Sequence, residues 1–166
     1  MTGKGSLNHN SRKFHAKNTD PNRTHWNVEY CNEDIKDVYH ELFDDALKRY
    51  NDKQTRKDRK IDDYYEKIRS GKQEKLFHEV ILQIGDKDNM GSETMEGQLA
   101  AKILDEYMKG FQERNPTLRV FAAHLHLDEA TPHLHIDFIP YVTGSKRGLD
   151  TRVSLKQALS SLGFKG

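Results

Sequence analysis

Hydrophobic residues recur along this chain at two spacings, which predict where it forms helices and where it forms strands. Over residues 33–50 the apolar positions fall three or four residues apart, behind Asn32, a residue type suited to N-capping. The same spacing runs over residues 93–115, between Ser92 as a candidate cap and Pro116. Both segments are expected to be amphipathic helices. In the second, the face expected to be buried consists of Leu99, Ile103, Leu104, Tyr107, Met108 and Phe111.

Four other segments have the alternation or composition of β-strands. Residues 25–30, HWNVEY, alternate apolar with polar side chains. Residues 76–85, LFHEVILQIG, are apolar and β-branched and end at a glycine, which predicts a buried strand. Residues 117–127 and 133–142 are further strand-like runs, and the loop DEATP between them has the length of a hairpin connection. We expect this pair to run antiparallel at the centre of a sheet.

The remaining segments complete the expected fold. Residues 1–24 show little periodicity and are expected to form an ordered loop. Residues 51–75 have few apolar positions and include Gly71, suited to the position after a helix, so we expect a second, largely solvated helix. A short helix is expected over residues 154–163. Strands interleaved with long helices give an α/β or α+β chain, and with a central antiparallel hairpin we expect α+β.

The length and composition limit the number of domains and the size of the core. The 166 residues suffice for one sizeable core, so we expect a single domain over residues 1–166. With 34% hydrophobic and 32% charged residues, the core should be modest and the surface strongly charged. The net charge of +1 indicates no class of partner by itself.

Cysteine content and hydropathy indicate the compartment. Cys31 is the only cysteine, which excludes an intrachain disulfide and a cysteine-based metal site and fits a reducing cytoplasm. No apolar run approaches the roughly 20 residues that span a bilayer, and the N-terminus lacks the apolar stretch of a signal peptide. We therefore expect a cytoplasmic protein, and we interpret the chain, which ends in open sequence at Gly166, as the N-terminal part of a longer one.

The stretch HLDEATPHLH places three histidines within ten residues, 126–135. Side chains alternate faces along a strand, so His133 and His135 share a face, and hairpin pairing brings His126 close to them. A single histidine there would be interpreted as a solvated surface residue, but three at this spacing predict a divalent metal site on one exposed face. Glu129 in the loop is a candidate to orient a ligand, bind metal through water or act as a base. Asp137 is either a supporting carboxylate or a surface residue.

The residues around this stretch also carry a family resemblance. The block HLDEATPHLHIDFIP resembles the metal motif of the Mob/Pre (MobV) plasmid-mobilisation relaxases, members of the HUH single-strand DNA endonucleases, in which U is a hydrophobic residue. His133, Leu134 and His135 match the HUH triplet. The segment HNSR, residues 9–12, resembles the N-terminal motif of the family. A third match, NTDPNRTHWNVEY, contains Arg23, His25 and Asn27 as candidate DNA-binding residues.

The resemblance implies a fold and a reaction. The fold is the HUH relaxase type, a central antiparallel sheet flanked by helices. The reaction is nicking of single-stranded DNA at an origin of transfer, with His9 as the nucleophile that forms a covalent 5′-phosphohistidine. Glu129 is expected to hold or deprotonate His9, and Arg12 and Arg23 are expected to contact phosphate. His126, His133 and His135 are expected to hold Mn²⁺ or Mg²⁺, although imidazole ligands by affinity favour zinc.

Three further assignments stay open at this point. Rivals to His9 as nucleophile are Tyr30, Tyr64, Tyr65, His15 and His25. The basic run expected to track DNA along the second helix is centred on Arg56, Lys57, Arg59 and Lys60. Acidic residues dilute this run, so a solvated helix laced with ion pairs is the alternative. Accessory mobilisation proteins and a coupling protein are possible partners besides the DNA.

Two other functional classes fit part of the pattern. A three-histidine metal hydrolase or oxidoreductase acting on small molecules would use the same ligands, but it needs a closed apolar pocket and has no need of His9. A non-catalytic origin-binding module would keep the basic surface and tolerate loss of the metal site. The complete histidine set argues against the second class.

Overall fold

The computed structural model describes residues 6–14, 16–86 and 88–164, and the chain divides into two compact units. Unit 1 comprises Met1–Asn32, His78–Arg114 and Ala122–Phe138. Unit 2 comprises Glu33–Phe77, Asn115–Phe121 and Ile139–Gly166. Each unit combines segments that are distant in the sequence. Two long strands contribute residues to both units.

Unit 1 is organised by an antiparallel sheet with the strand order β1-β3-β4-β2. The strands are β1 Val28–Asn32, β2 His78–Gln83, β3 Leu118–His126 and β4 His133–Val142. β3 and β4 are neighbours at the centre, joined by the loop that contains DEATP, so the predicted central hairpin is confirmed. β2 is an edge strand whose Ile81 is 45% exposed, which makes the prediction of a buried strand wrong for its second half. The α+β class is confirmed.

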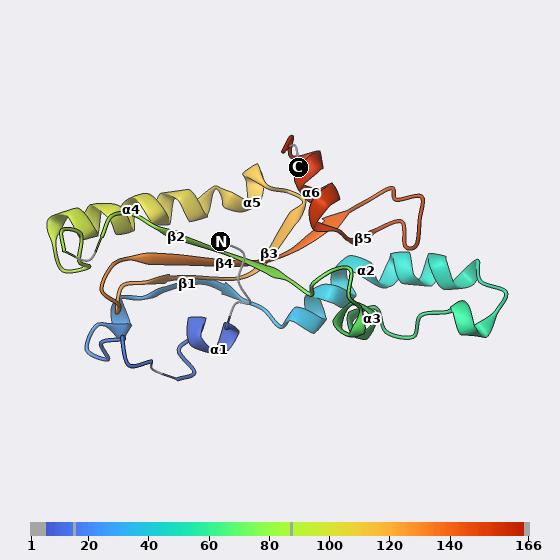
Figure 1. Ribbon diagram of the computed structural model, residues 1–166, viewed down its shortest axis with the longest axis horizontal. Coiled ribbons are helices and arrows are strands. Elements are labelled where there is room, and N and C mark those ends of the chain that lie inside the picture. Colours follow the sequence, from blue (N-terminus) through green and yellow to red (C-terminus); the bar gives the residue numbers. More distant parts are fainter. Residues whose placement is uncertain (1–5, 15, 87, 165–166) are drawn as a thin grey trace. The chain divides into compact units, whose positions relative to one another are not determined.

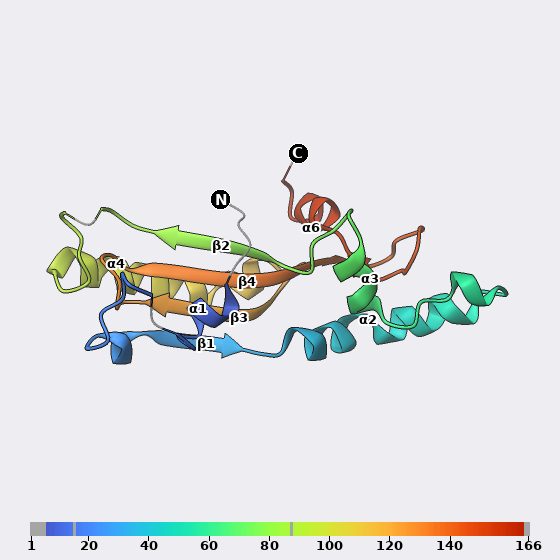
Figure 2. The same cartoon turned by 60° about the horizontal axis from the view of Figure 1, so that its bottom comes forward.

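The two faces of this sheet carry different side chains. Leu125, Leu134 and Ile136 lie on one face and are almost fully buried. Figures 1 and 2 show helix α4, Met95–Lys109, running along one side of the sheet and the short helix α1, Leu7–Asn10, lying on the other. The apolar face forms the core of unit 1, and the opposite face carries the histidines.

The helix predicted over residues 93–115 is two helices. α4 begins after Thr94, whose side chain accepts a hydrogen bond from the backbone N–H of Gly97, so the predicted cap Ser92 is wrong. It ends at Gly110, and α5, Phe111–Arg114, follows. The guanidinium of Arg114 donates to the carbonyl of Tyr107 and thereby satisfies an acceptor in the last turn of α4.

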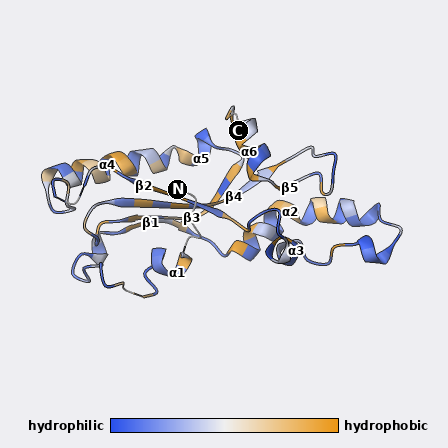
Figure 3. Cartoon of the chain, in the orientation of Figure 1, coloured by the Kyte–Doolittle hydropathy of each residue, from blue (hydrophilic) through white to orange (hydrophobic). Residues whose placement is uncertain are grey.

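The buried face of α4 also differs from the predicted one. Gly97, Ala100, Leu104 and Met108 are buried. Leu99, Ile103 and Tyr107 are 57%, 47% and 41% exposed, and the hydrophobic positions in Figure 3 are accordingly spread around the helix. The prediction considered only large apolar residues. The buried face of α4 also includes the small residues Gly97 and Ala100, which allow close packing.

Unit 2 is built on helix α2, Ile35–Asp52, and helix α3, Tyr64–Ser70. The cap of α2 is Asp34, which accepts from the backbone N–H of Lys36 at 2.8 Å, and the predicted cap Asn32 lies in β1 instead. Aromatic rings pack between the helices, with centroids 5.0 Å apart for Phe43 and Tyr64. The unit is completed by β5, Arg152–Val153, which pairs antiparallel with β4, and by α6, Leu155–Ser161.

The solvated helix predicted over residues 51–75 is mostly not a helix. Its first two residues end α2, a 3-10 turn, η2, Lys57–Arg59, follows, and the chain is α-helical again only from Tyr64. The side chain of Asn51 accepts from the N–H of Ile61 and donates to its carbonyl, at 2.9 and 2.8 Å, and this holds the chain in a loop. Gly71 follows α3 with φ −77°, so it does not use the left-handed conformation that the prediction assumed.

The N-terminal segment contains short helices where only a loop was expected. α1 is capped by Ser6, and a 3-10 turn, η1, Thr24–Trp26, precedes β1. Two-turn periodicity cannot be detected in a helix this short, so the sequence pattern offers no signal for it. In the described part of the chain, no helix combines the length and apolarity needed to cross a membrane.

Candidate active site

The histidine face of the unit 1 sheet is covered rather than solvated. His126 is fully buried and His135 is 7% exposed, so the expected exposed face is wrong. The reason is α1, whose residue Asn10 is itself 1% exposed and contacts three strands, β2, β3 and β4. The segment expected to be a loop closes the site.

His126 has one ring nitrogen satisfied and one unsatisfied. Its Nε2 donates to the backbone carbonyl of Asn10 at 2.8 Å, because a carbonyl oxygen can only accept. Burial lowers the pKa of His126 to about 4, so the ring is neutral at pH 7. Nδ1 therefore carries a lone pair, and it is buried without a hydrogen-bond partner. Such an atom is suited to binding a cation.

His135 is held by a buried carboxylate. Its Nδ1 lies 2.9 Å from Oε1 of Glu79 on β2, the register partner of Asp137, and donates to it. The same Glu79 oxygen accepts from Nδ2 of Asn10 at 2.7 Å, and Nδ2 also donates to Asp137 at 3.2 Å. Burial, together with the charge of Glu79, raises the pKa of Asp137 to about 7. Asp137 is fully buried, so of its two earlier interpretations the surface residue is wrong.

The imidazole rings of the three predicted metal ligands cluster on one face of the sheet. The ring centroids of His126 and His135 are 4.7 Å apart, and those of His133 and His135 are 6.4 Å apart. Nδ1 of His133 is also buried without a partner. Unsatisfied lone pairs on neutral imidazoles fit a divalent transition metal.

A second set of ligand atoms overlaps with this one. In the described chain, His9, His126 and Glu129 each offer an atom such that all lie within 4.8 Å of one another. His126 belongs to both sets. The centre of the site is therefore at His126, with His133 and His135 on one side and His9 and Glu129 on another.

His9 lies on α1, at the edge of the cluster. Its Nε2 is 3.4 Å from Oε1 of Glu129, and its ring centroid is 5.8 Å from that of His126. The side chain is 22% exposed, so the ring is within reach of a ligand from solvent. Nη1 of Arg12 lies 3.2 Å from Nε2 and donates to the His9 carbonyl at 3.1 Å.

Arg12 is committed to carboxylates of the loop. It pairs with Asp128 through two donors and with Glu129 at 2.9 Å, and its side chain is 8% exposed. It is also the described non-glycine residue with positive φ, 52°, a strained conformation of the kind found at functional sites. Although burial opposes ionisation, the hydrogen bond from Arg12 lowers the pKa of Asp128 to about 2, and it also lowers the pKa of Glu129. Glu129 is thus a carboxylate at pH 7.

The third motif supports the loop and lies partly at the surface. Asn27 accepts from the N–H groups of Leu127 and Asp128, at 2.7 and 3.2 Å. Arg23 donates to Asp20 at 3.1 Å and to the Leu127 carbonyl at 3.3 Å. His25 is exposed beside Trp26, which is 40% exposed. Asn27 and Arg23 shape the loop, and His25 is available to a ligand.

The rival nucleophiles are held in other ways. The hydroxyl of Tyr30 donates to Asp105 at 2.6 Å, and burial, with that hydrogen bond, raises its pKa. Tyr64 and Tyr65 belong to unit 2, where Tyr64 is buried and Lys36 lies over the Tyr65 ring. His15 lies outside the described residues.

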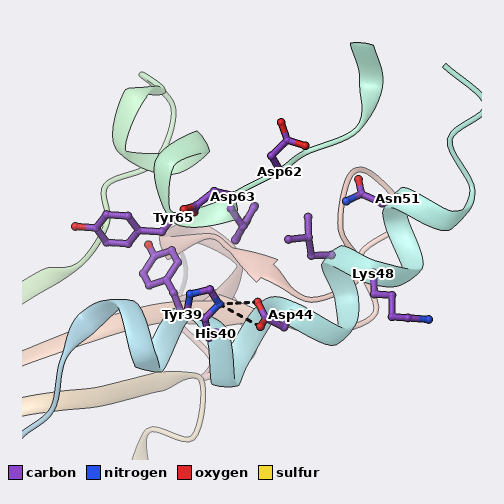
Figure 4. A pocket seen from close by; sticks show the side chains of 10 residues that line it. Tyr39, His40, Asp44, Lys48, Asn51, Asp62, Asp63 and Tyr65 are labelled. Carbon is purple, nitrogen blue, oxygen red and sulfur yellow. Dashed lines mark hydrogen bonds and ion pairs between the residues drawn. The ribbon is translucent and has the colours of Figure 1, made fainter. Parts of the chain in front are cut away.

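The basic run of residues 56–60 is not on a helix, so that part of the prediction is wrong, while its contact with DNA stays a prediction. Arg56 is paired with Asp58 by two hydrogen bonds. Figure 4 shows a neighbouring cavity of unit 2 whose lining includes Asp44, Asp62 and Asp63. Acidic side chains therefore offset the cations of this segment.

Three residues of the site were not found from the sequence. Asn10 stands inside HNSR, but nothing in the motif shows that its side chain reaches two carboxylates. Glu79 interrupts an otherwise apolar strand, and a charged residue at such a position is a usable signal for a buried functional group. Asp128 lies in the quoted loop and has no local signal, because its partner Arg12 is far away in the sequence.

The sequence of this chain matches one protein family and a curated member of it. The family model Mob_Pre, described as plasmid recombination enzyme, matches residues 4–162. A curated plasmid recombination enzyme of Streptococcus agalactiae is 24% identical over 165 residues, which are 95% of this chain and 30% of that protein. The chain thus spans about a third of the length of that relative.

One solved structure has a similar fold. It is a MobM relaxase domain (MOBV; Mob_Pre) bound to plasmid pMV158 oriT DNA, in a Mn-bound crystal at pH 5.5. The TM-score is 0.50 at 24% identity, covering 96% of this chain and 79% of that one. The likeness supports the antiparallel sheet with flanking helices described above.

Proposed function

Because this chain belongs to the Mob_Pre family of plasmid recombination enzymes, we propose that it is the nicking domain of an HUH-type relaxase, which cleaves single-stranded DNA at an origin of transfer. The observation that carries the proposal is the position of His9. Its ring stands 3.4 Å from an ionised Glu129 and edge-on to His126, in a part-exposed position. A nucleophile, a base and a cation site are thereby brought together.

The proposed step is a transesterification by His9. Neutral imidazole is a good nucleophile near pH 7, and Glu129 is placed to take the proton from Nε2 as Nδ1 bonds to phosphorus. The P–O3′ bond breaks, its electron pair stays on O3′, and that oxygen takes up a proton. The product is a 5′-phosphohistidine that conserves the bond energy, so a later 3′-hydroxyl can reverse the step.

His126, His133 and His135 would hold a divalent ion, Mn²⁺ or Mg²⁺ by family and Zn²⁺ by ligand affinity. Such an ion, when bound, polarises the scissile phosphate. The chain's own residues prepare the site for it. Asn10 fixes the tautomer of His126, and Glu79 fixes that of His135, so both rings direct a lone pair away from these partners.

The remaining family residues are proposed to act on DNA or on the loop. Arg12 is proposed to orient Glu129 and to hold the backbone carbonyl of His9 through its hydrogen bonds, so its role in catalysis is positioning. Three residues in and beside η1 are proposed to contact the single-stranded DNA, namely Arg23, His25 and Asn27. The basic run Arg56, Lys57, Arg59 and Lys60 is proposed to contact the phosphate backbone.

A small-molecule metal enzyme is less well supported. The cavity that touches His126, lined also by Asn10, Arg12 and His124, has a volume of about 160 Å³. Small-molecule sites usually enclose about 300–1,000 Å³. This cavity is too small to enclose a typical organic substrate, which argues against the small-molecule enzyme.

The test is the formation of a covalent adduct. Single-stranded oligonucleotides spanning candidate origins are incubated with the chain, with and without metal, and protein–DNA adducts are resolved on denaturing gels. A metal-dependent adduct on one strand supports the proposal, and no adduct with any origin strand contradicts it. We also propose a cytoplasmic location, accessory mobilisation proteins and a coupling protein as partners. Residues 1–166 are proposed to be a single catalytic domain, the N-terminal part of a longer protein.

A further inference from the structure

Two adjoining cavities in unit 2 lie beside the loop between β4 and β5. One has a volume of about 730 Å³ and extends from this loop to α3. The other, of about 500 Å³, extends from the same loop to α6. Arg147 and Arg152 line both cavities, so the two form one continuous surface, here called the hairpin groove.

The hairpin groove is strongly basic. Its cationic side chains are Lys67, Lys72, Lys146, Arg147 and Arg152, and the one carboxylate among the residues lining the two cavities is Glu74. The acid of the loop itself, Asp150, is neutralised by Arg49, with both hydrogen bonds at 2.8 Å. The charge of the loop is therefore left positive.

Four of these cations are available to a ligand. Lys67, Lys72, Lys146 and Arg147 are exposed and form no ion pair with a described carboxylate. Arg152 differs, because it donates to Ser145 at 2.9 Å and to Gln157 at 3.0 Å. Arg152 therefore shapes the groove, while the other four side chains can each bind an anion.

The loop that carries Arg147 is held in one conformation. Gly144 and Gly148 have φ of 70° and 71°, which favours glycine over other residues. The N–H of Ser145 donates to the Asp150 carbonyl at 2.9 Å and closes the loop. A fixed loop positions its cations before the ligand arrives, which lowers the entropy lost on binding.

The floor of the larger cavity is apolar. It includes Ile68, Leu149, Val153 and the ring of Tyr64, whose hydroxyl accepts from the N–H of Val153 at 3.1 Å. A strip of cations beside an apolar floor suits a polymer with a charged backbone and uncovered bases or sugars, which describes single-stranded nucleic acid. Duplex DNA keeps its bases stacked inside.

We propose that the hairpin groove is a binding site for the phosphate backbone of single-stranded DNA, contacted by Lys67, Lys72, Lys146 and Arg147. The choice of DNA rests on the proposed nicking function. Lys67 also lines a neighbouring cavity with Arg59 and Lys60, whose charges are offset there by Asp58, Asp62 and Asp63. The other three cations of the groove do not line that cavity.

The test measures non-specific binding without cleavage. A fluorescently labelled oligothymidine strand is titrated with the chain in EDTA at several salt concentrations. The groove variant replaces Lys67, Lys72, Lys146 and Arg147 by alanine. A variant matched in the change of charge replaces four exposed lysines of α2 and α4, of which Lys48 and Lys109 are ion-paired: Lys36, Lys48, Lys102 and Lys109. Each lost phosphate contact should reduce the slope of log K against log salt by about 0.7, so the groove variant should lose about 3.

A second variant should strengthen DNA binding instead of weakening it. Glu74→Gln removes the one carboxylate of the groove and keeps an acceptor for the N–H of Leu155, so it should bind oligothymidine more tightly than the wild type. An unchanged slope in the groove variant, an equal loss in the matched variant, or better competition by duplex than by single-stranded DNA would overturn the proposal. Adduct formation is measured separately. If the wild type forms an adduct but the groove variant keeps the wild-type salt slope, only the groove proposal fails. If the groove variant loses slope but the wild type forms no adduct, only the proposed nicking function fails.

Discussion

The backbone carbonyl of Asn10 accepts a hydrogen bond from Nε2 of His126 at 2.8 Å. This bond joins the helix that carries His9 to strand β3, which carries the candidate metal ligand His126. It also fixes the tautomer of a fully buried ring, so that Nδ1 of His126 keeps its lone pair for the site. The position of the proposed nucleophile His9 and the tautomer of the candidate ligand His126 are thus both set by α1.

Asn10→Asp should destabilise the fold strongly. The side-chain amide is 1% exposed and donates to Glu79 and Asp137, and a carboxylate in its place would bring a third acidic group against two others. Leaving a buried charge uncompensated costs about 3–5 kcal/mol. The free energy of unfolding, measured by denaturant at pH 7, should fall by about 3 kcal/mol.

Asn8→Asp is the matched control for this change. Asn8 is exposed on the same helix, so the same substitution should alter the free energy of unfolding by less than about 0.5 kcal/mol. Equal stability of the two variants would show that the amide of Asn10 does not join the carboxylates in solution.

Asp128 should make stability depend on pH in the acid range. Its side chain is fully buried against Arg12, and its pKa is lowered to about 2 from 3.8. A carboxyl with a lowered folded-state pKa stabilises the fold above its unfolded pKa, and this contribution disappears as pH falls through the folded value. Between pH 4 and pH 2 the wild type should lose about 2 kcal/mol that Asp128→Asn does not lose. Parallel unfolding curves for the two proteins over this range would contradict the assignment.

The sheet of unit 1 could be predicted from the sequence because its strands alternate apolar and polar residues. The central hairpin and the shared face of His133 and His135 follow from that period alone. The exposure of this face could not be predicted, because it depends on α1, a helix of four residues with no periodic pattern. Asn10 closes the site through contacts with residues far away in the sequence, and no local rule predicts such contacts.

The errors in the helices have a different physical origin. Residues 51–75 were interpreted as a solvated helix from their few apolar positions and Gly71, but Asn51 binds both backbone groups of Ile61 and holds the chain after α2 in a loop. Side-chain to backbone hydrogen bonds of asparagine compete with helix formation, and their partners are visible only in the fold. The cap of α4 was displaced from Ser92 to Thr94 because Ser92 is directed to the Glu129 carbonyl.

Neutralising the basic run should weaken DNA binding modestly. With Arg56, Lys57, Arg59 and Lys60 replaced by alanine, fewer counterions are released per complex, so the salt slope of binding should flatten. Because Arg56 is already paired with Asp58, the loss should be smaller than the value of about 3 for four free contacts on a single strand. Anisotropy titrations at several salt concentrations give the slope. A slope identical to that of the wild type would remove this segment from the DNA interface.

His133→Ala should abolish metal-dependent nicking and leave the fold intact. His133 is only half-buried, whereas His126 and His135 are buried, so its truncation costs the least packing of the three. Calorimetry with Mn²⁺ should show weakened binding, and the unfolding transition should stay close to that of the wild type. Cleavage at the wild-type rate by this variant at saturating metal would show that His133 is not a ligand.

His9→Ala should form no covalent adduct and still bind metal and DNA. His9 is the one described candidate nucleophile beside both Glu129 and His126, whereas Tyr30 is hydrogen-bonded to Asp105 and Tyr64 is buried in unit 2. The substitution also separates the two ligand sets, because metal affinity should fall if His9 is a ligand and persist if it is the nucleophile.

The chemistry of the adduct provides the decisive measurement. A phosphoramidate P–N bond is acid-labile and alkali-stable, whereas a tyrosine phosphodiester survives mild acid. The wild-type adduct should therefore dissociate in mild acid, and the same acid-labile adduct should form with Tyr30→Phe, Tyr64→Phe and Tyr65→Phe. An acid-stable adduct, or one that persists in His9→Ala and disappears with one of the tyrosine variants, would transfer the nucleophile to that tyrosine. The 3.4 Å contact between His9 and Glu129 would then have a role other than activating the nucleophile.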